Sequence, residues 1–405
     1  MLGMIGVAVL SAPALAASTD IGDVFIIAME NHNFIQPASL NASINPIYGD
    51  VAAPYINSLV TPGNANAAQT AWARNYVSVG AGVHPSEPNY IWTEAGTNFG
   101  IQNDHTPYGT GGTNQTTTQH LTALLNANGV SWKSYQEGID LTPGTNAKPT
   151  NTVLPQSQWI SPIQNFSGTN APFTGNPGYV NPYNGSNQYN YAVKHNPQAF
   201  FSDTNGGNNT TSTNPAAKYY APLEQLQTDL TNNTVSRYNW ITPDQYNDMH
   251  TALAGGFTYN GTAYTADQAE IAQGDNFLSM IVPEIMASTA YQNNGTIVIW
   301  NDETEGCDTT DGTCTAMEIV ISKLAKGNAY ASQVTVNHSS DLLTYQQIFN
   351  VGPCLGAACT ATYLADLFVP GTIPNAGTNA VPEPASLVLL AGGVLGLGLV
   401  RHRRV

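Results

Sequence analysis

The sequence DVFIIAM at residues 23–29 is the strongest fold signal in the chain. A short run that is apolar at nearly every position predicts a buried strand. A second such run, GTIVIW, occupies residues 295–300. Helical and strand patterns alternate around these two runs. The order predicts an α/β fold, a three-layer sandwich with a mostly parallel central sheet.

Weaker patterns extend this prediction in both directions. Further strands are expected at 69–77, 130–135, 237–242 and 318–322, and helices at 48–60, 88–95, 120–128, 223–230, 266–289 and 341–350. Residues 141–190 are rich in Pro, Asn, Gly and Thr and contain few apolar runs. They are expected to form a long irregular excursion over the surface, or a loop on the substrate side.

Composition excludes one large class of function. Only 9% of the 405 residues are charged, and the formal net charge is −16. A protein that binds the backbone of nucleic acids needs a basic face, so no nucleic-acid partner is expected. The content of 20 Tyr, 11 Phe and 6 Trp argues against disorder and for a packed core.

Both ends of the chain look like targeting segments. Residues 2–16 are small and apolar and end in an A-x-A-like site, so residues 1–17 are predicted to be a secretory signal peptide. At the other end, Val381-Pro382-Glu383-Pro384 precedes sixteen apolar or small residues, 385–400, and a basic group at 401–404. This order resembles a PEP-CTERM sorting signal, and an ordinary C-terminal membrane anchor is the alternative.

The PEP-CTERM resemblance implies a fate for the protein. It implies an exported protein of a Gram-negative bacterium, held transiently by its C-terminal segment and processed by an exosortase-type enzyme. The destination would be the cell envelope, the cell surface or the extracellular matrix. The catalytic domain is then expected at 20–372, and the linker with the sorting segment at 373–405.

The four cysteines form two close pairs, Cys307 with Cys314 and Cys354 with Cys359. In an exported protein such pairs predict two local disulfides. Four cysteines allow three connectivities, and local pairing is the most economical. A zinc site is the alternative, although no histidine lies close to either pair.

Acidic and amide side chains follow the two most apolar strands. Glu30 and Asn31 come directly after the first, and Asp302 and Glu303 come just after the second. Ligands collect at the carboxyl ends of strands in an open parallel sheet. Carboxylates that converge without a neighbouring Lys or Arg repel one another, so a bound cation would stabilise them. The alternative is ordinary polarity at strand ends.

The segment HPSEPNY at 84–90 places a hydroxyl at the start of a helix. Pro88 suits the first turn of a helix, so Ser86 is expected at or near its N-cap. A serine there could act as a nucleophile, because backbone N–H groups and the helix dipole favour negative charge. An ordinary capping serine is the alternative.

Three histidines complete the candidate set. His195 lies in KHNP, His250 in NDMH, and His338 precedes Ser339 in what reads as a polar loop before a helix. A histidine of this kind, taken alone, is more often a surface or hydrogen-bonded residue than a catalytic one.

Six motifs, taken in order, resemble those of the phosphoesterase family of bacterial and fungal acid phosphatases and phospholipases C. They are Glu30-Asn31 after an apolar strand, HPSEPNY at 84–90, GVSWKSYQEG at 129–138, KHNP at 194–197, ITPDQYNDMH at 241–250 and IWNDETEG at 299–306. The resemblance implies an alkaline-phosphatase-like fold with Ser86 as nucleophile and as ligand of one divalent metal ion. It implies that Glu30, Asn31, Asp302 and Glu303 complete the metal site. His195 and His250 would line the phosphate pocket, and His338 matches a later histidine of the family.

The resemblance also implies an activity. We expect hydrolysis of small phosphate monoesters through a phosphoserine, with an imidazolium that neutralises the phosphate or protonates the leaving oxygen. The metal could be Ca²⁺, Mg²⁺, Mn²⁺ or Zn²⁺. The phospholipase C branch continues the first motif with Ser-Phe-Asp, where this chain departs from it with His32-Asn33-Phe34-Ile35. The HPSEPNY form is closer to the acid phosphatase branch than to the phospholipases, which favours monoesters. A phospholipase C-type diesterase and a non-catalytic surface or matrix binding protein are the alternatives.

Overall fold

A computed structural model describes residues 20–40, 44–80, 82–141, 148–159, 175, 178–209, 213–307 and 309–374. The predicted signal peptide lies outside these ranges, and so do the PEP-CTERM motif and the basic group that ends the chain. Among the helices in the described ranges, none is long and apolar enough to cross a bilayer.

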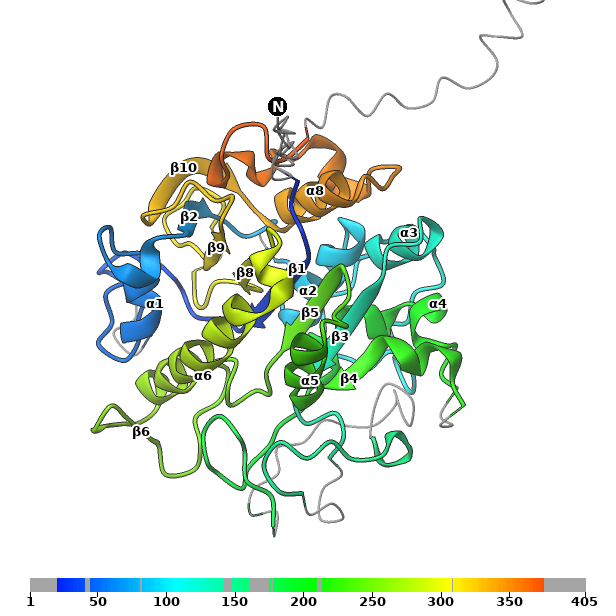
Figure 1. The fold of residues 1–405 in the computed structure, drawn as a ribbon, viewed down its shortest axis with the longest axis horizontal. Coiled ribbons are helices and arrows are strands. Elements are labelled where there is room, and N and C mark those ends of the chain that lie inside the picture. Colours follow the sequence, from blue (N-terminus) through cyan, green and yellow to red (C-terminus); the bar gives the residue numbers. More distant parts are fainter. Residues whose placement is uncertain are drawn as a thin grey trace, which may run out of the picture.

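The centre of the protein is an eight-stranded sheet in the order β10-β2-β9-β8-β1-β5-β3-β4 (Figure 1). Every neighbouring pair is parallel except those that β9 makes with β2 and β8. The predicted mostly parallel sheet is therefore confirmed. The strands are β1 Val24–Met29, β2 Thr70–Tyr76, β3 Trp132–Gln136, β4 Tyr220–Pro222, β5 Tyr238–Thr242, β8 Thr296–Asn301, β9 Glu318–Ser322 and β10 Tyr330–Val336.

Helices cover both faces of the sheet and give three layers. The side chains of β1 alternate between two cores. Ile26 belongs to the core that includes residues of α2, α3 and α8, and Ile27 belongs to the core that includes residues of α1, α5, α6 and α7. The strand is buried at all six positions, which explains its continuous apolar sequence. The helices are α1 Pro54–Leu59, α2 Ser86–Ala95, α3 Leu121–Ala127, α4 Ser202–Asn205, α5 Glu224–Asn232, α6 Asp267–Ala287, α7 Thr289–Gln292 and α8 His338–Phe349.

Several elements differ from the sequence-based expectation. Strands β4 and β10, helix α4 and the small hairpin of β6 (Phe257–Tyr259) with β7 (Thr262–Tyr264) are not among the expected elements. Helix α8 begins at His338 rather than at Asp341, because the Asn337 side chain and Ser340 form a reciprocal capping box. The prediction that His338 lies in a loop before the helix is therefore wrong.

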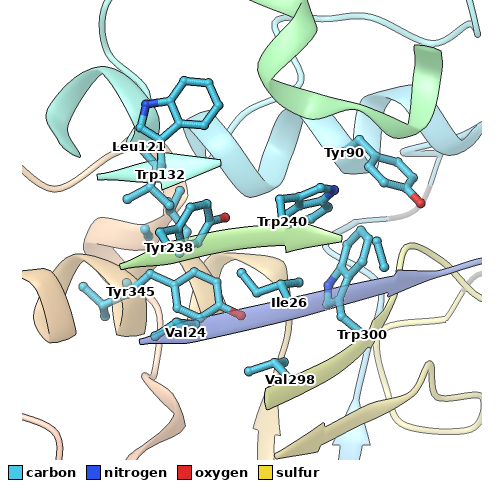
Figure 2. Close-up of a cluster of buried hydrophobic side chains, with 14 of the residues drawn as sticks. Val24, Ile26, Tyr90, Leu121, Trp132, Tyr238, Trp240, Val298, Trp300 and Tyr345 are labelled. Carbon is cyan, nitrogen blue, oxygen red and sulfur yellow. The ribbon is translucent and has the colours of Figure 1, made fainter. Parts of the chain in front are cut away.

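An aromatic cluster supports the carboxyl ends of the central strands (Figure 2). The ring of Trp300 from β8 lies 5.5 Å from that of Trp240 in β5 and 5.3 Å from that of Tyr90 in α2. These edge-to-face contacts fix α2 against the sheet. They place the polar end of Tyr90 beside the residue that follows β1.

Both disulfides have the predicted local pairing. Cys307 is bonded to Cys314, and Cys354 to Cys359. The alternative of a zinc site formed by these cysteines is therefore wrong. The second disulfide closes a short loop after α8. The first lies in the segment that follows Asp302 and Glu303.

Candidate active site

Glu30 is the central residue of the site. It follows β1 directly, is fully buried, and its backbone carbonyl accepts a hydrogen bond from Asn301 at 2.9 Å. Its Oε1 accepts the Tyr90 hydroxyl at 2.6 Å, and its Oε2 accepts the Ser86 hydroxyl at 3.1 Å. Burial raises the pKa of Glu30 to about 8, because an isolated carboxylate is poorly solvated there.

Ser86 is the first residue of α2 and is 2% exposed. The N-cap is Pro85, and no side chain caps the helix. The alternative of an ordinary capping serine is therefore wrong, since the hydroxyl donates to Glu30 and not to the helix. The amide of Glu87 donates to Asp104 at 3.0 Å, and Pro88 has no N–H. Of the backbone N–H groups of these three residues, that of Ser86 is therefore the one available to bind an anion.

Asp302 faces the same point from the end of the neighbouring strand β8. It is fully buried, and neither of its carboxylate oxygens has a hydrogen-bond partner of normal geometry among the described residues. Burial raises the pKa of Asp302 well above its ordinary value, and the charges of Glu30 and Glu303 raise it further. An orphaned buried carboxylate beside another carboxylate is costly unless a cation compensates it.

Glu303 connects this strand end to the start of α2. Its Oε2 accepts the Asn89 amide at 2.9 Å and also pairs with the His84 ring. The charge of Glu303 raises the pKa of both Glu30 and Asp302, so the three carboxylates share one electrostatic environment. Glu303 therefore lies near the other two carboxylates, with one oxygen already held by protein donors.

His195 lies between two buried carboxylates. Its Nε2 is 3.1 Å from Glu30 Oε1, and its Nδ1 is 3.3 Å from Asp248 Oδ2. The ring stacks on Tyr90 with 5.0 Å between the ring centroids. Burial lowers the pKa of His195 well below its ordinary value, and the charges of Lys194 and His250 lower it further.

Donor atoms of Glu30, His195 and Asp248 all lie within 4.8 Å of one another, a spacing compatible with a metal ion. The two carboxylates, however, face different nitrogens of the His195 ring. One ion cannot bind both ring nitrogens of a histidine, so the contacts describe a chain from Glu30 through His195 to Asp248. Both separations lie within ion-pair distance, but neither ring nitrogen of His195 makes a hydrogen bond with a described residue.

His250 lies at the edge of this group, partly exposed, with its ring 6.0 Å from that of His195. Its amide donates to Asp248 Oδ1 at 2.8 Å, and its Nδ1 is 3.0 Å from the Thr251 hydroxyl. Burial and the charge of Lys194 lower the pKa of His250 to about 4. Both pocket histidines are therefore neutral near pH 7 in the free protein, whereas the sequence-based mechanism expected an imidazolium.

His338 has both ring nitrogens engaged inside the protein. Nδ1 faces the Tyr76 hydroxyl at 2.6 Å and the Trp300 ring N–H at 3.1 Å, and Nε2 is 2.5 Å from the carbonyl oxygen of Asp302. Burial lowers the pKa of His338 to about 4. In this arrangement His338 holds the backbone of Asp302 and does not face the pocket.

Asn31 is half-buried beside Glu30. In the described part of the chain, its side chain makes no hydrogen bond with the other candidate residues. The structure therefore brings together Glu30, Ser86, Asp302 and Glu303 of the five predicted metal ligands. Asn31 as a ligand stays a prediction.

Sequence reasoning had assigned no role to Lys194 or Asp248, although both belong to the quoted motifs. Lys194 Nζ is 2.9 Å from Asp104 Oδ2. Burial alone would lower the pKa of Lys194, but the charges of Glu30 and Asp104 outweigh burial and hold it above its ordinary value. Lys194 thus keeps a positive charge near Glu30 and Asp302. This charge partly offsets the burial that raises the pKa values of both groups.

The donor set at the strand ends fits a divalent metal ion. Glu30 and Asp302 offer buried carboxylate oxygens, the two oxygens of Asp302 are orphaned, and the Ser86 oxygen lies beside them. Oxygen donors of this kind suit Ca²⁺, Mg²⁺ or Mn²⁺ and are also found around Zn²⁺. The residues present are therefore compatible with the predicted cofactor.

Comparisons with known proteins agree with the sequence motifs. Residues 55–352 match the Phosphoesterase family, and residues 380–404 match the PEP-CTERM protein-sorting motif. A probable acid phosphatase of Kluyveromyces lactis is 27% identical over 167 residues, which cover 41% of this chain and 30% of that protein. An acid phosphatase of Aspergillus fumigatus is 25% identical over 169 residues, covering 41% and 28%. The matched region is thus less than a third of the length of these curated relatives.

Two solved structures show a distant similarity. One is a protein in the alkaline phosphatase superfamily from Vibrio parahaemolyticus, with a TM-score of 0.40, 10% identity and coverage of 85% of this chain and 72% of that chain. The other is the phosphonate monoester hydrolase of Agrobacterium radiobacter, with a TM-score of 0.42, 10% identity and coverage of 87% and 79%.

Proposed function

The chain belongs to the Phosphoesterase family, and from this premise we propose that it is an exported phosphomonoesterase that works through a phosphoserine at Ser86. One observation carries the proposal. A buried serine hydroxyl at the start of α2 donates to Glu30, and the orphaned carboxylate of Asp302 lies beside them. This combination provides a buried nucleophile beside carboxylates whose negative charge is not compensated.

Glu30 and Asp302 would hold the metal ion next to Ser86, with Asn31 and Glu303 as further ligands. When bound, the ion would supply positive charge that offsets the carboxylates and favours the deprotonated form of the serine. The Lys194 side chain supplies a further positive charge. Together these charges attract a phosphate locally, although the net charge of −16 repels anions at long range.

The remaining roles follow from the contacts. Glu30, held by Tyr90, fixes the direction of the Ser86 hydroxyl and would take its proton. The serine oxygen attacks the phosphorus as the bond to the leaving oxygen breaks. A bound phosphate dianion favours the imidazolium form of a nearby histidine. His195 or His250 would therefore gain a proton together with the substrate and pass it to the leaving oxygen. Water then hydrolyses the phosphoserine.

A phosphate monoester is the proposed substrate class. The HPSEPNY motif has the form that is closer to the acid phosphatase branch, and both matched curated relatives are named acid phosphatases. A phospholipase C-type diesterase and a non-catalytic binding protein stay as alternatives. The matched sorting motif supports export, followed by exosortase processing at the envelope of a Gram-negative bacterium.

Hydrolysis of two chromogenic substrates tests the proposal. We expect the purified protein to hydrolyse p-nitrophenyl phosphate, to lose this activity in a chelator, and to regain it when a divalent metal is added. Preferential hydrolysis of p-nitrophenyl phosphorylcholine would instead establish a diesterase. A folded, metal-supplemented protein that hydrolyses neither substrate across the pH range would support the binding-protein alternative.

A further inference from the structure

A second group of metal-ligating side chains lies outside the candidate active site. Donor atoms of His32, Asp267 and Glu270 all lie within 4.8 Å of one another. His32 comes from the loop after β1, and the two acidic residues come from the first turn of α6. We propose that this α6 cluster (His32, Asp267 and Glu270) binds a second divalent transition-metal ion, with Zn²⁺ as the best match.

The histidine has the geometry of a ligand. His32 is 2% exposed, and neither of its ring nitrogens makes a hydrogen bond of normal geometry with any residue that the structure describes. Its Nε2 is 3.3 Å from Asp267 Oδ1 and 3.8 Å from Glu270 Oε2, without the alignment that a hydrogen bond to either oxygen requires. Ligand atoms about 2.1 Å from a tetrahedral zinc lie about 3.4 Å apart. The observed separations approach this value.

The two carboxylates are already oriented by the protein. Asp267 Oδ2 accepts the backbone N–H of Asn45 at 2.9 Å and the Asn45 side-chain amide at 2.6 Å. Glu270 Oε1 accepts the amide of Ala252 at 3.0 Å. In each case one oxygen is held by backbone or amide donors while the other faces His32. Outer hydrogen bonds of this kind orient the ligands of metal sites.

Access and charge also suit a cation. The side chains of Asp267 and Glu270 are 15% and 22% exposed, so an ion can reach the cluster from solvent. Glu305 adds a third negative charge to the surroundings of His32. An imidazole nitrogen among carboxylates favours Zn²⁺, because Ca²⁺ and Mg²⁺ prefer ligand sets made of oxygen atoms alone.

Such an ion would join three segments that flank the candidate active site. The amide of His32 donates to the carbonyl of Glu30 at 2.8 Å. Ala252, held by Glu270, lies two residues after His250. The ion would therefore fix both loops against α6 without touching the reacting atoms. Its role would be structural support of the site.

Zinc stoichiometry of the full chain tests the inference. The glutamine variant Glu270→Gln keeps an acceptor for Ala252 and removes one charged ligand. The matched control is Glu284→Gln, the same change later in α6. After loading with Zn²⁺ and dialysis, we expect Glu270→Gln and His32→Gln to retain one zinc equivalent fewer than wild type, and Glu284→Gln to match wild type. In wild type, the first equivalent of Zn²⁺ should raise the melting temperature, and this increase should be absent in Glu270→Gln.

Separate variants keep this test independent of the proposed function. Asp302→Asn should remove a different equivalent, so the double variant with Glu270→Gln should lose both. If the active-site metal were absent, only the loss in Glu270→Gln would remain. Equal zinc content in wild type and Glu270→Gln would overturn the inference and leave the α6 cluster as an imidazolium–carboxylate ion pair. Glu270→Gln decides the question even if His32→Gln does not fold.

Discussion

Replacing Ser86 by alanine should abolish turnover and leave the fold nearly intact. The hydroxyl is buried, caps no backbone group, and donates one hydrogen bond to Glu30. Losing a hydrogen bond to a carboxylate costs about 1–3 kcal/mol. A protein of this kind has a total stability of about 5–15 kcal/mol, so the variant remains folded. Removal of a covalent nucleophile, by contrast, lowers kcat by about 10⁴-fold or more.

The assay compares kcat for p-nitrophenyl phosphate with the melting temperature measured by circular dichroism. Ser78→Ala is the control, because Ser78 is also buried and its hydroxyl lies 3.3 Å from that of Thr304. It should lose about 1 kcal/mol of stability, as expected for a hydrogen bond between neutral groups, and keep its kcat. If Ser86→Ala kept wild-type turnover per folded molecule, the covalent mechanism would be refuted.

Three further predictions concern the metal, the packing of α6 and the pH dependence of stability. Asp302→Asn should lower kcat about 100-fold and recover part of it at high concentrations of divalent metal, as measured by titrating the metal into the assay. Asp275→Ala removes the acceptor that holds the amides of Tyr55 and Ile56 at 2.9 and 2.7 Å, and should lower the free energy of unfolding in urea by about 1–3 kcal/mol. Burial lowers the pKa of His120, but hydrogen bonds to two carboxylates outweigh it and raise the folded-state pKa above the ordinary value. The stability that this histidine contributes is therefore fully present below about pH 6.5 and is lost as the pH rises through the folded-state pKa. The free energy of unfolding of wild type should fall over that pH window, and that of His120→Gln should change less.

The central strands could be predicted because complete burial produces a simple sequence pattern. Strands β1 and β8 are buried at every position and therefore read as continuous apolar runs. Strand β10 is the edge of the sheet and has exposed or half-buried residues at most positions, so its sequence, YASQVTV, lacks that signature. The start of α8 was missed because its capping pair, Asn337 with Ser340, is chemically weaker than the Ser/Thr and Glu pair that marks many helices.

The candidate site was predictable where it depends on strand ends and not where it depends on distant contacts. Glu30 and Asp302 follow neighbouring parallel strands, so topology alone brings them together. The direction of a side chain at the end of a helix or in a loop is set by tertiary contacts that spacing does not encode. That is why the resemblance included His338 among the candidate catalytic residues, although its ring faces Tyr76 and the backbone of Asp302, and why no role was given to Asp248.

Detection of the covalent intermediate tests the central claim most directly. The enzyme would be mixed with excess p-nitrophenyl phosphate at acidic pH, quenched in acid within the first turnovers, digested, and analysed by tandem mass spectrometry. The account predicts one phosphoryl group on the peptide that contains Ser86, located on that residue and absent after prolonged incubation without substrate. Active enzyme that shows a pre-steady-state burst of p-nitrophenol but carries its phosphoryl group on another residue would contradict it.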